Sequence, residues 1–184
     1  ARAQEQLEYL SQNHSVISGL ETGFYDLDKA TSGLHEGEMI VIAARPGMGK
    51  TAFALNIATH AAMTTKKAIA IFNLEMSKEQ LVNRMLSALG GIEGKKLQNG
   101  QMMQTDWKKY NEAMSQLADT NMYIEDNAGI TSSDIRAKCR RLASKPEGLG
   151  LVIIDYLQLL TLGGKRPDSR QQEVSDISRS IKTM

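Results

Sequence analysis

The sequence predicts an α/β domain in which a mostly parallel sheet is covered by helices on both faces. Continuous apolar runs, typical of strands buried on both sides, recur along the chain. Segments in which apolar residues have helical spacing separate these runs. The length of 184 residues is that of about one domain. Strands that alternate with helices in this way favour a parallel sheet.

The first 37 residues carry weaker core signals than the rest of the chain. Residues 1–12 favour a helix, but with Leu7 and Leu10 as its apolar side chains it suits a linker or docking helix better than a core helix. Residues 13–37 are rich in turns, and a short helical piece is expected around residues 25–30. This segment either wraps around the domain or reaches a neighbouring subunit.

From residue 38 onward the expected elements alternate regularly. The run Met39–Ala44 (MIVIAA) predicts a strand buried on both faces, and an alanine-rich helix over Thr51–Met63 follows it. Ala68–Leu74 (AIAIFNL) predicts a second buried strand. Ser77 begins a capping-box pattern and therefore starts a helix, which ends at Gly90–Gly91.

The second half of the chain continues the alternation. A helix near residues 106–118 places Trp107 and Tyr110 one turn apart, and we expect both rings to lie in the core rather than to form a base-stacking surface. Thr131 begins a second capping-box pattern, for a helix that runs to about residue 144. The other expected elements are strands at Met122–Glu125 and Leu151–Asp155 and a last helix at Ser169–Met184.

Composition excludes several classes of protein and site. The 22 Lys and Arg residues nearly balance the 21 Asp and Glu residues, so net charge gives no sign of a nucleic-acid or membrane partner. Cys139 is the only cysteine, which excludes an internal disulfide and a multi-cysteine metal site. No apolar run approaches the roughly 20 residues of a membrane helix, and no signal peptide opens the sequence. We therefore expect a cytoplasmic protein with no membrane partner.

One expected helix is strongly basic. Its apolar stripe of Ile135, Cys139 and Leu142 predicts that the opposite side is exposed to solvent. A contact with another subunit or with nucleic acid is the alternative. The basic residues are Arg136, Lys138, Arg140, Arg141 and Lys145.

The strongest functional signal is the segment Ala44–Thr51 (ARPGMGKT), between an expected strand and an expected helix. A phosphate-binding loop has the pattern Gly, four residues, Gly-Lys-Ser/Thr; Ala44 replaces the first glycine and the remainder matches. Glycines let backbone N–H groups turn toward phosphate oxygens, and the helix N-terminus adds partial positive charge. Lys50 is expected to reach the β and γ phosphates and the Thr51 hydroxyl to bind Mg²⁺. The alternative is a glycine turn with a chance GKT sequence.

Two carboxylates follow expected strands. In open parallel sheets, ligands bind beyond the carboxyl ends of the strands, where Glu75 and Asp155 are expected. Asp155 fits the acid that holds Mg²⁺, although a polar residue that merely ends a strand is the alternative. Glu75 could orient and deprotonate an attacking water, or it could begin the next helix.

Several segments, taken together and in order, resemble the replicative DNA helicases of the DnaB family. The family usually carries Ala-Arg-Pro where this chain has Ala44, Arg45 and Pro46, so the missing glycine fits the resemblance. The similarity covers nearly all of residues 20–184. The segments are TGFYDLD (22–28), AARPGMGKTAFALNIA (43–58), FNLEMS (72–77), DIRAKCRRL (134–142), VIIDYLQLL (152–160) and RQQEVSDISRSIK (170–182).

The resemblance implies a RecA-like P-loop NTPase core that assembles as a homo-hexamer and hydrolyses ATP with Mg²⁺ while moving on single-stranded DNA. It implies that Lys50 acts on the phosphates and that Glu75 is the catalytic base. It also implies that Thr51 and Asp155 bind or associate with the metal. The residues expected to bind the nucleotide are Arg45, Pro46, Gly47, Met48, Gly49, Lys50, Thr51 and Ala52.

The resemblance also divides the chain. Residues 1–14 would be the linker helix that docks on an adjacent subunit, and residues 15–184 the N-terminal portion of the ATPase domain. In the family a sensor strand, DNA-contacting loops and an arginine finger come later, and a domain that contacts primase comes earlier. We therefore expect a sheet that is incomplete toward the C-terminus, and contacts with primase and the helicase loader through parts outside this sequence. Little or no turnover is expected, because an arginine finger contributes about 10³–10⁵ in rate.

Two other functions are compatible with the motifs. A RecA-type recombinase or another RecA-fold ATPase shares the phosphate loop and the strand-end acids, but the pairing of LEMS with IDYLQL favours the helicase. A nucleotide-gated interaction module would bind ATP without mechanical work. Such a module has no need of a water-activating acid at Glu75.

Overall fold

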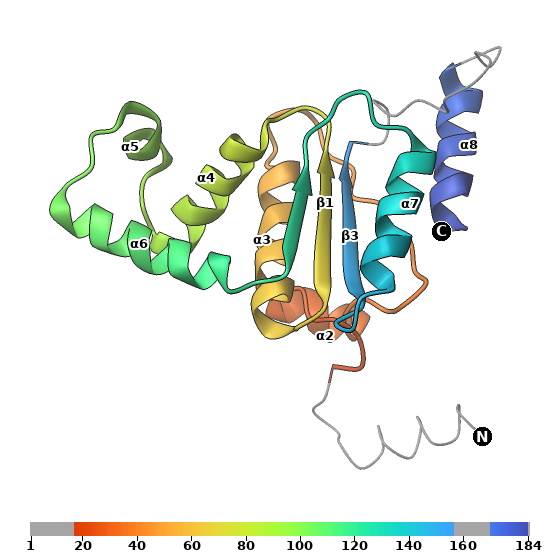
Figure 1. Cartoon of the computed structure of the whole chain (residues 1–184), viewed down its shortest axis with the longest axis horizontal. Helices are drawn as coiled ribbons and strands as arrows, with labels where there is room; N and C mark the ends of the chain where they lie inside the picture. Colours follow the sequence, from red (N-terminus) through yellow and green to blue (C-terminus); the bar gives the residue numbers. More distant parts are fainter. Residues whose placement is uncertain (1–16, 157–169, 184) are drawn as a thin grey trace.

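A three-stranded parallel sheet forms the centre of the molecule (Figure 1). The computed structural model describes residues 17–156 and 170–183. The strand order is β2–β1–β3, with β1 at Ala68–Asn73, β2 at Met122–Glu125 and β3 at Leu149–Asp155. Both pairings of β1 are parallel, and Asn73 at the end of β1 lies opposite Asp155 at the end of β3. The predicted α/β fold class is confirmed.

The helices begin close to the predicted positions where a local capping signal is present. Ser77 accepts a hydrogen bond from the backbone N–H of Gln80, whose side chain accepts one from the Ser77 N–H. Thr131 and Asp134 form the same capping box. These bonds satisfy N–H groups that a helix terminus leaves unpaired. The helices are α2 (Tyr25–Thr31), α3 (Lys50–Thr64), α4 (Lys78–Gly90), α5 (Gly94–Asn99), α6 (Gln104–Ala118), α7 (Ser132–Ala143) and α8 (Arg170–Lys182).

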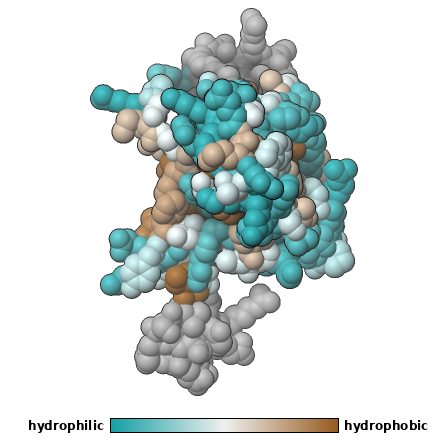
Figure 2. Space-filling view, turned by 90° about the vertical axis from the view of Figure 1, so that its left-hand side faces the viewer, coloured by the Kyte–Doolittle hydropathy of each residue, from teal (hydrophilic) through white to brown (hydrophobic). Residues whose placement is uncertain are grey.

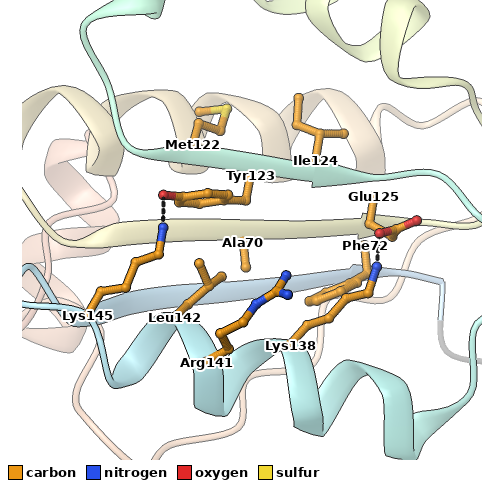
Figure 3. Close-up of a pocket in the computed structure, with 10 residues that line it drawn as sticks. All are labelled: Ala70, Phe72, Met122, Tyr123, Ile124, Glu125, Lys138, Arg141, Leu142 and Lys145. Atoms are coloured by element: carbon orange, nitrogen blue, oxygen red, sulfur yellow. Dashed lines mark hydrogen bonds and ion pairs between the residues drawn. The ribbon is translucent and has the colours of Figure 1, made fainter.

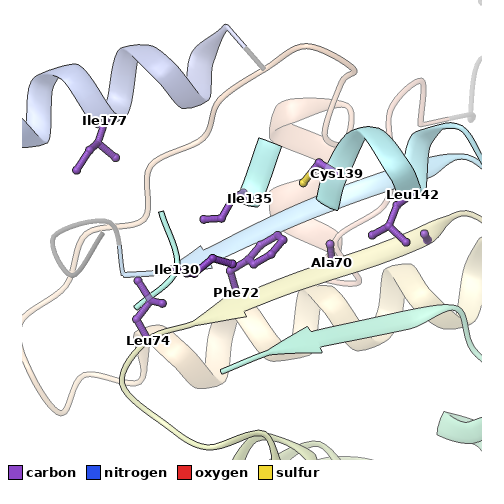
Figure 4. Close-up of a cluster of buried hydrophobic side chains, with 9 residues drawn as sticks. Ala70, Phe72, Leu74, Ile130, Ile135, Cys139, Leu142 and Ile177 are labelled. Carbon is purple, nitrogen blue, oxygen red and sulfur yellow. The ribbon is translucent and has the colours of Figure 1, made fainter. Parts of the chain in front are cut away.

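The core lies on both faces of β1, because successive side chains of a strand point in opposite directions. Ile69 and Ile71 pack with α3 and α4 on one side. Ala70 and Phe72 pack with α7 on the other side, where Ile177 of α8 joins the cluster (Figure 4). Figure 1 accordingly shows α3, α4 and α6 on one side of the sheet and α7 and α8 on the other. The predicted apolar stripe of α7 is confirmed as part of this core.

The prediction of a buried strand at Met39–Ala44 is wrong. Residues 38–45 adopt no regular secondary structure, and all of them except Met39 are exposed. Ile40, Val41 and Ile42 expose 54%, 75% and 39% of their surface. A strand requires a neighbour for its backbone N–H and C=O groups, and no strand within residues 17–156 and 170–183 pairs with this segment. An apolar run records the tendency to be buried, but it does not supply that neighbour.

The expectation for Trp107 is also wrong. The Trp107 side chain is 50% exposed and contacts the edge of Tyr110, with 5.8 Å between ring centroids. Helix α6 instead buries Ala113 and Asp106, and the Asp106 carboxylate pairs with Lys96 of α5 at 2.8 Å. The short helix α5 was not expected from the sequence. Seen from the end that carries α5 and α6, the surface is mainly hydrophilic, with apolar residues scattered among polar ones (Figure 2).

Some expectations fall on residues outside the described ranges. These are the linker helix at residues 1–14, the polar end of the segment VIIDYLQLL, and the first residue of the expected last helix. Among the described residues, no helix combines the length and the apolar character needed to cross a bilayer.

The segment before the phosphate loop wraps around the domain and packs on α3. Its ends meet in an antiparallel bridge between Leu20 and Leu34. Gly23 has a φ of +83°, and a Cβ there would lie 2.6 Å from the ring of His60 on α3, so both the backbone angle and the close approach require glycine. The Asp28 carboxylate accepts hydrogen bonds from the Thr22 N–H and hydroxyl and from the Gly23 N–H. These bonds fix the turn that lies against α3.

The contrast between Ile71 and Ile40 gives a direct test of the core. Ile71 in β1 is 1% exposed and Ile40 is 54% exposed. We expect Ile71→Ala to lower the free energy of unfolding by about 2–5 kcal/mol, and Ile40→Ala to lower it by less than about 1 kcal/mol. Urea unfolding followed by circular dichroism measures both. Equal losses would mean that residues 39–44 are buried after all.

Asp28 should make stability depend on pH. Burial by itself raises the pKa of this carboxyl, but the hydrogen bonds from Thr22 and Gly23 outweigh it and leave the pKa below its ordinary value of 3.8. A group whose pKa is lower in the folded state stabilises the fold above its unfolded pKa, and this contribution is lost as the pH falls through the folded pKa. We expect Asp28→Asn to cost about 1–3 kcal/mol at neutral pH.

The same measurement at low pH supplies the control. The difference in unfolding free energy between the wild type and Asp28→Asn should shrink once the pH falls below about 4. Urea unfolding at pH 7, 4 and 3 follows this change. A difference that stays constant across the range would contradict the role given to the charged carboxylate.

Candidate functional site

The candidate site lies where β1 and β3 end. The parallel pairing sets Asn73, the last residue of β1, opposite Asp155, the last residue of β3. Helix α3 begins at Lys50, directly after the phosphate-loop sequence. Residues far apart in the sequence therefore meet at the carboxyl edge of the sheet, which is the ligand-binding edge of open parallel sheets.

The loop before α3 has the backbone expected of an anion-binding turn. Gly47 and Gly49 have φ values of +80° and +85°, and Gly49 is the N-cap residue of α3. The space around both is open, so the left-handed backbone angle, rather than crowding, calls for glycine. Alternation of such angles turns successive N–H groups to one side. Residues 45–49 are exposed, as is Ala52 in the first turn of α3, so the loop is accessible to a ligand.

Two consecutive residues of α3 converge on Asp155. The Lys50 Nζ lies 2.8 Å from Asp155 Oδ1, and the Thr51 hydroxyl donates to Asp155 Oδ2 at 2.5 Å. Asp155 is only 6% exposed, so its charge needs these partners. The Lys50 ammonium also lies 4.7 Å from the centre of the Tyr156 ring. The three residues predicted separately from motif and strand position form one contact group.

Asn73 is a functional candidate that the sequence analysis missed. It is 1% exposed, and its Nδ2 donates to Asp155 Oδ2 at 3.3 Å. Its Oδ1 accepts the backbone N–H groups of Glu75 and Met76. The available signal was the single amide in the otherwise apolar run AIAIFNL, next to Glu75. A polar residue in a buried strand needs partners, and here those partners belong to the site.

Glu75 lies in the bend between β1 and α4. It does not begin the helix, because Ser77 is the N-cap residue and α4 starts at Lys78. The Glu75 side chain is exposed, and among the residues that the structure describes its carboxylate has no hydrogen-bond or ion-pair partner. Its backbone N–H donates to Asn73 Oδ1 at 3.0 Å. The carboxylate is therefore held near the strand ends by the turn while it stays open to solvent.

The chemistry of the site suits a small hard cation beside phosphate. Thr51 and Asp155 bring a hydroxyl and a carboxylate together, and Mg²⁺ prefers oxygen ligands of this kind, with water and phosphate completing its shell. No group of three or more His, Cys, Asp or Glu side chains that could hold a metal occurs within the described ranges. A cation at this edge would thus be shared between the protein and a phosphate group.

A separate cavity of about 480 Å³ lies between β2 and α7 (Figure 3). Lys138 pairs with Glu125, and the Lys145 ammonium donates to the Tyr123 hydroxyl at 2.7 Å. No residue of the phosphate loop lines this cavity. It is therefore not part of the site described above. The lining residues are Ala70, Phe72, Met122, Tyr123, Ile124, Glu125, Lys138, Arg141, Leu142 and Lys145.

Two solved structures resemble this chain along nearly its whole length. One is a DnaB-like replicative helicase, described together with its interactions with primase; the TM-score is 0.88 and the identity 34%, over 96% of this chain and 42% of that one. The other is an isolated ATPase domain, with a TM-score of 0.89 and 33% identity, over 99% of this chain and 65% of that one. These matches support the RecA-like architecture.

Sequence relatives give the same result. The chain is 48% identical to the replicative DNA helicase DnaC of Bacillus subtilis and 49% identical to the replicative DNA helicase DnaB of Geobacillus stearothermophilus. Each match covers 98% of this chain but 39% of the relative, so the chain spans well under half the length of these helicases. The family model for the DnaB-like helicase C terminal domain matches residues 19–184. The chain therefore belongs to the family of DnaB-like helicase C-terminal domains.

Proposed function

We propose that this chain is the nucleotide-binding portion of a helicase motor domain. It binds Mg²⁺ and ATP at residues 45–52, and in the complete protein hydrolysis drives movement on single-stranded DNA within a homo-hexameric ring. The observation that carries this proposal is the meeting of Lys50 and Thr51 with Asp155 at the carboxyl edge of the sheet. That arrangement brings a phosphate-binding cation and a metal-binding acid to one place.

Each residue of the site has a distinct task in this proposal. The backbone N–H groups around Gly47 and Gly49 and the N-terminus of α3 hold phosphate oxygens. Lys50 places its positive charge on the outer phosphates. Thr51 and Asp155 hold the metal, which when bound neutralises charge on the phosphate oxygens.

Glu75 is proposed as the general base. Its exposed position next to the strand ends leaves the carboxylate free to orient a water molecule and to accept its proton. A protein that only bound nucleotide would need Lys50 and Thr51 but not this acid. Glu75 therefore separates a hydrolysing motor from a nucleotide-gated interaction module.

Partners of the complete protein are part of the same proposal. One of the similar structures is that of a DnaB-like helicase described with its interactions with primase. We propose that primase and a helicase loader contact the complete protein through segments outside the matched 39%. Hydrolysis by the present chain alone should be weak, because an arginine finger from a neighbouring subunit supplies about 10³–10⁵ of the rate where it acts.

Lys50→Ala tests the phosphate-binding role. Loss of the ammonium removes charge-assisted hydrogen bonds to phosphate, so we expect the affinity for Mg²⁺-ATP to fall about 10- to 100-fold. Titration with a fluorescent ATP analogue measures this affinity. Lys108→Ala, at an exposed position on α6, is the matched control and should bind as the wild type does. Unchanged binding by Lys50→Ala would refute the site.

Glu75→Gln tests the hydrolytic role. It should be made in a chain continued to the full length of the relatives, so that every subunit contact is present. We expect Mg²⁺-ATP binding within about twofold of the wild type and a loss of hydrolysis of about 10²–10⁴-fold, because the general base is gone.

Unwinding of a forked DNA duplex is the second readout of the same pair of proteins. Wild type should unwind the fork, and Glu75→Gln should not. Glu79→Gln, on the exposed first turn of α4, is the control and should retain activity. Hydrolysis that survives in Glu75→Gln would transfer the role of base to another residue, and hydrolysis without unwinding in wild type would favour a recombinase-like ATPase.

A further inference from the structure

Asn73 joins the two acids of the site through a single side chain. Its Oδ1 accepts the N–H of Glu75 at 3.0 Å and the N–H of Met76 at 2.7 Å. Its Nδ2 donates to Asp155 Oδ2 at 3.3 Å. One end of the amide therefore holds the turn that carries Glu75, and the other end holds the acid at the end of the neighbouring strand.

The environment of Asn73 makes these bonds costly to lose. The residue is 1% exposed, at the last position of the central strand β1. A buried polar group that loses its partner bears the full cost of its desolvation. Asp155 Oδ2 already accepts the Thr51 hydroxyl, so the Asn73 amide and Thr51 converge on the same oxygen. A shift of that oxygen changes the position of the bond that Asn73 must keep.

Asparagine has the chemistry that this position requires. Its planar amide carries an acceptor and a donor on one short, rigid group. Aspartate would keep the acceptor for the turn but lose the donor, and it would set a second negative charge beside Asp155. Serine offers one short hydroxyl in place of two separate ends. The observed contacts use both ends of the amide, which is the property that distinguishes asparagine from these residues.

We propose that Asn73 is a positioning residue that couples cation and nucleotide binding at Asp155 to the placement of the Glu75 turn. The inference rests on the proposed roles of the two acids and adds a connection between them. When Asp155 is held by the cation and by Thr51, its carboxylate fixes the Asn73 amide. The fixed Oδ1 then holds the N–H groups of Glu75 and Met76 more tightly, so the turn is ordered when nucleotide is bound.

Hydrogen exchange in the present chain tests this coupling. We expect the Glu75 and Met76 amides of the wild type to exchange about three- to tenfold more slowly with Mg²⁺-ATP than with ATP in EDTA, which is the range that one hydrogen bond supports. Exchange read by mass spectrometry on peptides spanning residues 72–78 reports it. Equal exchange in the two conditions would overturn the coupling without use of any variant.

Asn73→Asp separates the two ends of the amide. It keeps the acceptor and removes the donor, so we expect the Mg²⁺-dependent protection of the turn to disappear while Mg²⁺-ATP still binds. Asn121→Asp is the matched control: its Nδ2 donates to the Lys66 carbonyl, remote from Asp155. The control should keep the protection.

The outcomes distinguish this inference from the proposed function. Retained protection in Asn73→Asp would overturn the positioning role, and outright loss of nucleotide binding would make Asn73 a binding residue instead. Asn73→Ser serves if the aspartate variant does not fold, since it lacks the second end of the amide and should also lose the protection. Failure of the Lys50→Ala test would refute the nucleotide site itself and leaves a different pattern from either result.

Discussion

The site depends on the need of one buried carboxylate for partners. Asp155 is 6% exposed, and its two oxygens receive Lys50, Thr51 and Asn73. These donors come from the first turn of α3 and from the end of β1, so a single acid ties the helix after the phosphate loop to the centre of the sheet. A buried carboxylate without such donors would be strongly destabilising. The requirement for satisfied charge therefore brings the functional groups together.

The sheet supplies the geometry on which this contact depends. β1 is packed on both faces, and its parallel register with β3 brings the last residues of the two strands side by side. A one-residue slip would move Asn73 away from Asp155 and would also turn the buried side chains of β1 to the wrong faces. The packing of the core therefore also protects the alignment of the site.

The sequence predicted those features that local physics decides. The capping boxes at Ser77 and Thr131 and the strand β2 formed where the pattern placed them. Features that depend on distant partners were not predictable in this way. Whether residues 39–44 form a strand depends on a pairing neighbour, and the exposure of Trp107 depends on what packs against α6. The link from Asn73 to Asp155 spans 82 residues of sequence and appears only when the strands are aligned.

The exposed segment 39–44 shows how the phosphate loop is held. In the described residues the loop is fixed from its C-terminal side, through Lys50 and Thr51 on Asp155, while the residues before Arg45 have no sheet partner. The glycines set the shape of the turn, and the bonds to Asp155 set its position. A strand that paired with residues 39–44 would anchor the loop from its N-terminal side as well. The position of the phosphate-binding groups relative to the sheet is thus determined by the acid, and the stiffness of the loop by whatever pairs with the segment before it.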